Sequence, residues 1–192
     1  MLTNLLNLFA GLGERGSGSG PARVCDPPCD FEMARTVFLD IRKAGVKLEE
    51  SCFTAVVRMN CMHAHEAEAL EIYREMQTFN ISPKNRTLTP LLARFSEVGD
   101  HDTCFSLYEE MIRRYELEPV EKDYISMLNL TVSLRDERFY AILDRFMEMN
   151  LVPSSAVWPV LESWFANSQT NFSVAIVKPS LEGQISVNPI RL

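Results

Sequence analysis

Four basic residues stand where a periodic chain could contact successive phosphate groups. Arg86 and Lys122 occupy equivalent places 36 residues apart, and Lys84 stands two residues before Arg86. Arg58 lies upstream of them, one helical turn beyond Thr54. Lys and Arg side chains at a repeat spacing can follow a phosphate backbone, and each contact steepens the salt dependence of binding by about one unit. The alternative is that these residues simply belong to a solvated surface.

The overall charge limits the kind of nucleic-acid binding that this chain can have. Its 192 residues carry a formal net charge of −7, and 46% of them are hydrophobic. A protein that holds nucleic acid by bulk attraction is usually basic, so the composition argues against nonspecific binding. A local basic stripe is compatible with it, because nearby groups set the field at a groove. No run of about 18 apolar residues predicts a membrane-spanning helix.

No other grouping of residues predicts catalysis, a cofactor or a metal site in this chain. Cys61, His63 and His65 alternate, but they fall at a helix end and turn, where their side chains would not converge on one ion. The Gly/Ser run lacks the preceding strand and the Lys-Ser/Thr pair of a phosphate-binding loop. The cysteines form no disulfide framework, which indicates a reducing compartment. They are Cys25, Cys29, Cys52, Cys61 and Cys104.

The elements that must position these residues come from an internal repeat. Three apolar columns recur every 35 residues and keep a common register. They are Phe38, Tyr73, Tyr108 and Leu143; Ile41, Met76, Met111 and Phe146; and Ala34, Ala69, Cys104 and Phe139. Within one unit, Ala69, Tyr73 and Met76 lie at i, i+4 and i+7, the spacing of one face of a helix. The columns therefore predict one amphipathic helix per unit.

A further helix precedes this one in each unit, for example around Leu88, Leu91 and Leu92. A proline closes three of the units, and Pro90 and Pro159 are expected in the first turn of their helices, where they do little harm. Such a helical hairpin cannot bury both apolar faces alone, so neighbours must stack. The sequence predicts an all-α fold, a right-handed α-α superhelix of about four to five hairpins.

Composition divides the chain into four parts. Residues 1–10 resemble the first helix of a truncated repeat, and 11–30 form a flexible Gly/Ser/Pro insertion. Residues 31–167 make the hairpin array, and 168–192 are an irregular or disordered tail. Aromatic side chains near residue 160 are expected to close the end of the core: Trp158, Trp164 and Phe165. The helical start and unpatterned tail suggest a fragment of a longer protein.

A period near 35, paired helices and a closing Gly/Asn-aliphatic-x-Pro resemble the pentatricopeptide repeat; the tetratricopeptide repeat has a period of 34 and lacks that proline. The run from Glu50 to Ala166, with ESCFTAVVRM and NISPKNRTLTPLLARFSEVGDHDTCFSLYEEM, is similar to the repeat region of the proteinaceous RNase P family. The resemblance covers about residues 1–166. It implies a repeat domain that grips precursor tRNA and a separate metal-dependent nuclease domain that cuts the 5′ leader.

This resemblance implies several further expectations. The chain stops where the family's zinc-binding connector and nuclease domain should begin, so Mg²⁺ and Zn²⁺ are expected only in that missing portion. The expected partner is RNA, above all precursor tRNA, together with a separate nuclease or protein partner and no membrane. The expected compartment is mitochondrion, plastid or nucleus, with an organelle favoured although no transit peptide is evident.

In pentatricopeptide repeats that read single-stranded RNA, two residues per unit specify the base. The corresponding pairs here are Thr3 with Glu49, Thr54 with Lys84, Thr89 with Val120, and Ile125 with Ser154. None of them fits the reading code, which favours recognition of a folded RNA by shape and backbone. The predicted RNA-binding residues are Thr54, Arg58, Lys84, Arg86, Thr89, Lys122 and Ile125. A protein–protein adaptor built on the same α-solenoid stays open as the second function class, because a fold does not fix a function.

Overall fold

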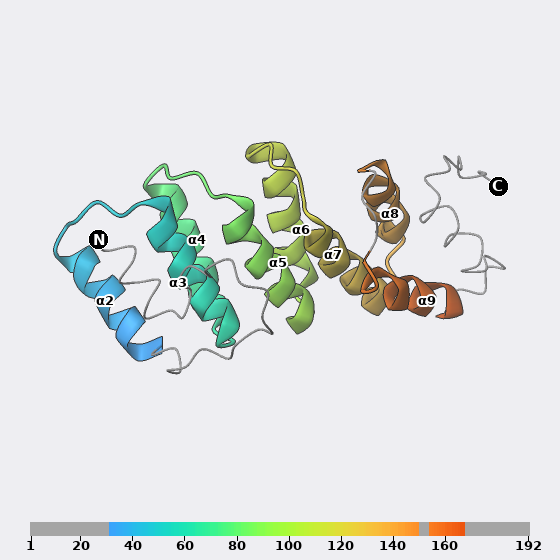
Figure 1. The fold of residues 1–192 in the computed structure, drawn as a ribbon, viewed down its shortest axis with the longest axis horizontal. Helices are drawn as coiled ribbons and strands as arrows, with labels where there is room; N and C mark the ends of the chain where they lie inside the picture. Colours follow the sequence, from blue (N-terminus) through green and yellow to red (C-terminus); the bar gives the residue numbers. More distant parts are fainter. Residues whose placement is uncertain (1–30, 150–153, 168–192) are drawn as a thin grey trace, which may run out of the picture.

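The computed structural model describes residues 31–149 and 154–167, and this part of the chain is helical with no strand (Figure 1). The predicted helix at 1–10, the insertion at 11–30, Cys25 and Cys29 and the tail at 168–192 lie outside it. The helices are α2 (Phe31–Lys43), α3 (Glu50–Met62), α4 (Glu66–Thr78), α5 (Asn85–Val98), α6 (His101–Glu109), η1 (Glu110–Arg114), α7 (Glu121–Leu134), α8 (Arg138–Glu148) and α9 (Val157–Asn167).

The helices form two layers along the long axis of the molecule (Figure 1). The first helices of successive units, α3, α5, α7 and α9, pack against one another in a row. The second helices α4, α6 and α8 each pack on the first helix of their own unit, and α2 packs on α3. Three hairpins are thus stacked between α2 and α9, which confirms the predicted helical solenoid.

The core between the layers consists of the three predicted columns. Every residue of these columns is buried, and full burial of a large apolar side chain stabilises a fold by about 1.5–3 kcal/mol. At the C-terminal end, the Trp164 ring stacks on Phe139 with centroids 4.2 Å apart, and Phe165 is buried beside it. These contacts confirm that the aromatic residues of α9 close the core. The three described cysteines are also buried as free thiols.

The turn that joins the two helices of a unit closes in the same way in each hairpin. An N–H donates to the carbonyl five residues earlier: His65 to Asn60 at 2.9 Å, and equivalently Asp100 to Phe95 and Asp136 to Thr131. The residue before each donor has a positive φ, namely 63° at Ala64, 81° at Gly99 and 53° at Arg135. This is the Schellman geometry that ends many helices, and it favours glycine. Ala64 and Arg135 adopt it at a cost of about 1 kcal/mol or more.

The junction from a second helix to the next first helix is one residue longer after α6 than after α4, because the chain makes a π-helical turn there. Met76 and Met111 are 35 residues apart, whereas Ile81 and Leu117, which follow them, are 36 apart. The Ile81 N–H donates to the Met76 carbonyl five residues back, but the Leu117 N–H donates to the Met111 carbonyl six residues back. The segment η1 therefore absorbs the extra residue before the next unit begins.

The two prolines inside helices lie at different distances from the beginning of their helix. Pro159 is the third residue of α9, in the first turn as predicted. Pro90 is the sixth residue of α5, so its predicted place in the first turn is wrong. A proline at this position leaves the carbonyl four residues earlier, that of Arg86, without its usual intrahelical N–H donor.

Ion pairs join successive second helices at intervals that follow the repeat. Arg35 of α2 pairs with Glu68 of α4, and Arg42 pairs with Glu75 at 2.7 Å. Glu110 in η1 accepts hydrogen bonds from three side chains of α4, those of Tyr73 (2.6 Å), Arg74 (2.5 Å) and Gln77 (2.9 Å). Most basic side chains of this layer are therefore tied to carboxylates.

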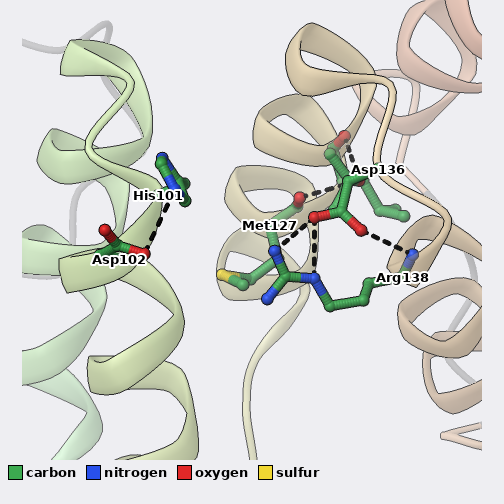
Figure 2. A network of polar contacts seen from close by, with 7 residues as sticks. His101, Asp102, Met127, Asp136 and Arg138 are labelled. Atoms are coloured by element: carbon green, nitrogen blue, oxygen red, sulfur yellow. Dashed lines mark hydrogen bonds and ion pairs between the residues drawn. The ribbon is translucent and has the colours of Figure 1, made fainter.

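The junction of α6 with α8 uses an arginine in a different way. The Arg138 guanidinium lies over the Phe105 ring, 3.5 Å from its centroid, and its Nε donates to Asp136 at 2.8 Å. Figure 2 shows Arg138 and Asp136 opposite His101 and Asp102, the first two residues of α6. The Arg138 hydrogen bond is the main cause that holds the pKa of Asp136 below its ordinary value. This contact fixes the last described second helix on its neighbour.

The strained turn after α3 gives a test of this geometry. We expect Ala64→Gly to raise the free energy of unfolding by about 0.5–1 kcal/mol, because relief of the left-handed strain exceeds the added entropy of the unfolded chain. The matched control is Ala141→Gly, the same change at an exposed position inside α8, which should lower stability by about 1 kcal/mol. Urea unfolding monitored by circular dichroism measures both, and equal losses in the two variants would contradict the assigned turn.

Candidate nucleic-acid interface

Three of the predicted basic residues lie at the beginnings of neighbouring first helices. Lys84 precedes the first residue of α5, Arg86 is the second residue of α5, and Lys122 is the second residue of α7. All three are exposed, and α5 packs directly against α7. The structure thus brings them to one edge of the first-helix layer. Arg58 is half-buried and lies further along α3.

These basic residues differ in how their charge is neutralised. Arg86 reaches Glu50 of α3 through two hydrogen bonds, of which that from Nε to Oε1 is 3.1 Å. Lys84, Lys122 and Arg58 form no ion pair with any residue in 31–149 or 154–167. Lys84 still lies close enough to Glu50 to be one of the charges that lower the pKa of that carboxyl. Lys84 and Lys122 are thus exposed cations without an ion pair at the edge of the first-helix layer, unlike the paired arginines of the second helices.

Two threonines at the positions that read bases in other pentatricopeptide repeats, Thr54 and Thr89, face the next first helix. Thr54 is only 4% exposed, and its hydroxyl lies 2.6 Å from that of Thr87 and donates to Glu50 at 2.8 Å. A nucleobase could reach Thr54 only by displacing these groups. Thr89 stands at the equivalent place in α5, is half-buried and lies close to Asp123 of α7.

Ile125, the third residue in this series, is half-buried and packs against the core. The structure therefore places Thr54 and Thr89 between neighbouring first helices and Ile125 against the core, while Lys84, Arg86 and Lys122 lie at the edge of the first-helix layer. Contact of any of these residues with RNA stays a prediction.

The pKa values of two carboxyl groups between the first helices, Glu50 and Asp123, are shifted in opposite directions. Burial acts to raise the pKa of Glu50, but hydrogen bonds from Arg86 and Thr54 outweigh it, so the pKa lies below the ordinary value. Burial raises the pKa of Asp123 in spite of the hydrogen bond from the Val120 N–H at 2.8 Å and the nearby Thr89 hydroxyl. Glu50 is therefore a fixed anion that holds Arg86 in place.

The alternating Cys61, His63 and His65 are not brought together as ligands. Cys61 is buried, which raises the pKa of its thiol to about 12, while the rings of His63 and His65 lie 4.9 and 4.7 Å from the Phe31 ring. Among the described residues no group of three His, Cys, Asp or Glu is placed to hold a metal ion. None of the described helices has the length and apolar character needed to cross a bilayer.

Glu50, which bonds both Thr54 and Arg86, and Thr87, which bonds Thr54, were not predicted from the sequence. Glu50 lies four residues before Thr54 on the same helix, a spacing that brings side chains together, so this contact could have been found. Thr87 comes from the next unit, and its contact depends on how closely α3 and α5 approach. The repeat period alone does not give that distance.

A family described as the pentacotripeptide-repeat region of PRORP matches residues 24–171 of this chain. Among curated proteins of Arabidopsis thaliana, the pentatricopeptide repeat-containing protein At5g66520 is 30% identical over 135 residues, which cover 69% of this chain and 20% of that protein. Proteinaceous RNase P 1, chloroplastic/mitochondrial, is 24% identical over 165 residues, which cover 84% of this chain and 27% of that protein. The chain thus spans about a fifth to a quarter of the length of these relatives.

Two solved structures from the same plant share the fold. The crystal structure of the repeat domain of protein-only RNase P 1 in complex with tRNA has a TM-score of 0.71 and 19% identity, covering 86% of this chain and 79% of that one. Nuclear proteinaceous RNase P 2 has a TM-score of 0.68 and 18% identity, covering 79% of this chain and 33% of that one.

The Glu50 contacts predict a pH-dependent contribution to stability. We expect Glu50→Gln to lower the free energy of unfolding by about 1 kcal/mol at pH 7, because it removes the charge that Arg86 contacts. The pKa of Glu50 is lowered in the folded state, so the stabilisation is complete above the ordinary value of 4.5 and is lost as the pH falls through the folded value. Urea unfolding at pH 7 and near pH 4 should show the difference narrowing.

The neighbouring exposed carboxylate Glu49 supplies the control, since Glu49→Gln removes the same charge one residue earlier. That variant should stay within about 0.5 kcal/mol of the parent chain at both pH values. A Glu50→Gln deficit that does not change with pH would show that the amide disturbs packing and that the ion pair contributes nothing.

Proposed function

This chain belongs to the pentacotripeptide-repeat family of PRORP, the proteinaceous RNase P, and we propose that it is an RNA-binding module that holds a folded precursor tRNA. The observation that carries the proposal is the pair Lys84 and Lys122, exposed at the edge of adjacent first helices without an ion pair among the described residues. Two such cations can contact phosphates of one backbone as point charges.

The packing between the first helices favours recognition of shape over reading of bases. Thr54 is already bonded to Glu50 and Thr87, so the residue that would select a base in this unit is occupied. Phosphate contacts position a protein on a nucleic acid without carrying sequence information. A folded RNA with a fixed arrangement of phosphates is the substrate class that this edge fits, and precursor tRNA is the member that we propose.

We propose that cleavage is carried out by a part of the enzyme other than this module. Removal of a 5′ leader would need metal ions, and the described residues offer no set of ligands for one. We propose that Mg²⁺ and Zn²⁺ belong to a separate nuclease portion and that this module supplies affinity and orientation. We also propose an organelle, mitochondrion or plastid, as its compartment, because relatives are named as chloroplastic or mitochondrial.

Reversal of the two free lysines tests the proposal. We expect Lys84→Glu combined with Lys122→Glu to weaken binding of the full chain to a precursor tRNA at least tenfold, about 1.4 kcal/mol. The slope of log affinity against log salt should become shallower by about 1.5 units, because two phosphate contacts are lost. Arg86 is left unchanged, since its reversal would place two carboxylates together at Glu50. Filter binding over a salt series measures both quantities.

The matched control reverses two cations of the second-helix layer, Lys43 and Arg113, whose side chains are both 78% exposed. Their ion pairs with Asp40 (3.6 Å) and Glu109 (3.9 Å) are long and exposed, so their loss should change stability little. The variant Lys43→Glu with Arg113→Glu has the same net charge as the test variant and should bind within about twofold of the parent chain. Equal losses of RNA affinity in the two variants would show that binding depends on overall charge and not on Lys84 and Lys122. Absence of binding to precursor tRNA and to single-stranded RNA of equal length would favour the protein adaptor.

A further inference from the structure

A pocket of about 480 Å³ opens between the loops that precede α3 and α5. Its walls include Phe53 from α3, Val46 and Lys47 from the first loop, and Phe79 from the end of α4. A volume between about 300 and 1,000 Å³ is typical of sites that take a small organic group. None of the residues predicted to bind RNA lines this pocket, so it is a separate feature of the surface.

An aromatic ring stands open at the pocket wall. Phe79 is 60% exposed although it is a large apolar side chain, while Phe53, whose ring centroid lies 6.1 Å away, is fully buried. The pocket is therefore anchored in the core on one side and presents a ring to solvent on the other. Proteins that bind unpaired nucleotides stack bases on aromatic rings of this kind.

The charges around the pocket fit a phosphate. Its charged lining residues are Arg42, Lys47 and Glu75, of which Arg42 and Glu75 pair with each other at 2.7 Å. Lys47 is exposed and has no ion-pair partner in the described ranges. The pocket therefore carries one uncompensated positive charge on a chain whose formal net charge is −7.

One unit further along the array, the equivalent side chains are hydrogen-bonded to one another. The positions of Arg42, Glu75 and Phe79 are taken there by Gln77, Glu110 and Tyr115. Gln77 donates to both Glu110 and Tyr115, each at 2.9 Å, and Tyr115 is half-buried. The open ring and the free lysine are thus particular to the junction of α2 with α4 and do not follow from the repeat.

We propose that this pocket takes one unstacked nucleotide of the bound RNA, with its base on the Phe79 ring and its phosphate at Lys47. This inference rests on the proposed function and adds a second contact region to it. The loop from Phe79 leads within five residues to Lys84, so the pocket adjoins the basic edge of the first helices. A nucleotide turned out of a folded RNA could enter the pocket while neighbouring phosphates contact that edge.

Three substitutions at one residue test the stacking contact in the full chain with precursor tRNA. Phe79→Ala should weaken binding about tenfold or more, as loss of one base–aromatic stack does, and Phe79→Leu should weaken it similarly although it stays apolar. Phe79→Trp should retain affinity within twofold, and RNA should quench its fluorescence beyond the quenching seen in the parent chain. Met62→Ala, which truncates a side chain that is 59% exposed at the end of α3, is the control and should have no effect.

The outcomes separate this inference from the proposed function. If Lys84→Glu with Lys122→Glu weakens binding but Phe79→Ala does not, the pocket takes no nucleotide while the basic edge still binds RNA. If Phe79→Leu binds as well as the parent chain, the contact is apolar and the stacking assignment is overturned. If the parent chain binds no RNA, both proposals fall. Loss in Phe79→Ala and Phe79→Leu, with retention and added quenching in Phe79→Trp, supports the pocket.

Discussion

Side-by-side packing of the first helices α3, α5 and α7 is the interaction on which the rest of this structure depends. No hairpin here can bury its apolar residues alone, so the three columns between the layers become a core only when units are stacked. Close approach of the first helices also forces the polar groups between them to satisfy one another. The hydroxyls of Thr54 and Thr87 and the carboxylate of Glu50 do so within a few ångströms.

The charged side chains of the two layers differ in how many of them form ion pairs. The second helices use arginines to bridge neighbouring units, as in the pairs of Arg35 and Arg42 with glutamates of α4. At the beginnings of the first helices within residues 31–149 and 154–167, Arg86 is the one cation in an ion pair, and the lysines are unpaired. An acidic protein can therefore present lysines without ion pairs at this edge, where they stand among exposed carboxylates such as Glu49 and Glu118.

The sequence predicted the features that repeat and missed those that belong to one unit. Columns such as Phe38, Tyr73 and Tyr108 predicted the helices and the core, because burial on one face leaves a periodic pattern. The π-helical turn, the depth of Pro90 and the burial of Thr54 each depend on a local bond or on the distance between two helices. Phe79 is exposed whereas Tyr115 is half-buried, because Tyr115 has a hydrogen-bonding neighbour, Gln77. Aligning one repeat position at a time in the sequence does not show such a contact.

The π-helical turn at η1 bears on how such an array tolerates changes in length. One extra residue in an α-helix would rotate everything beyond it by about 100°, since a turn takes 3.6 residues. The buried face of the helix would then point to solvent. Here the wider turn takes up the residue locally, so Met111 near its start and the unit beginning at α7 after it both remain in phase with the core. A repeat protein built this way can gain a residue by insertion without losing the alignment of its layers.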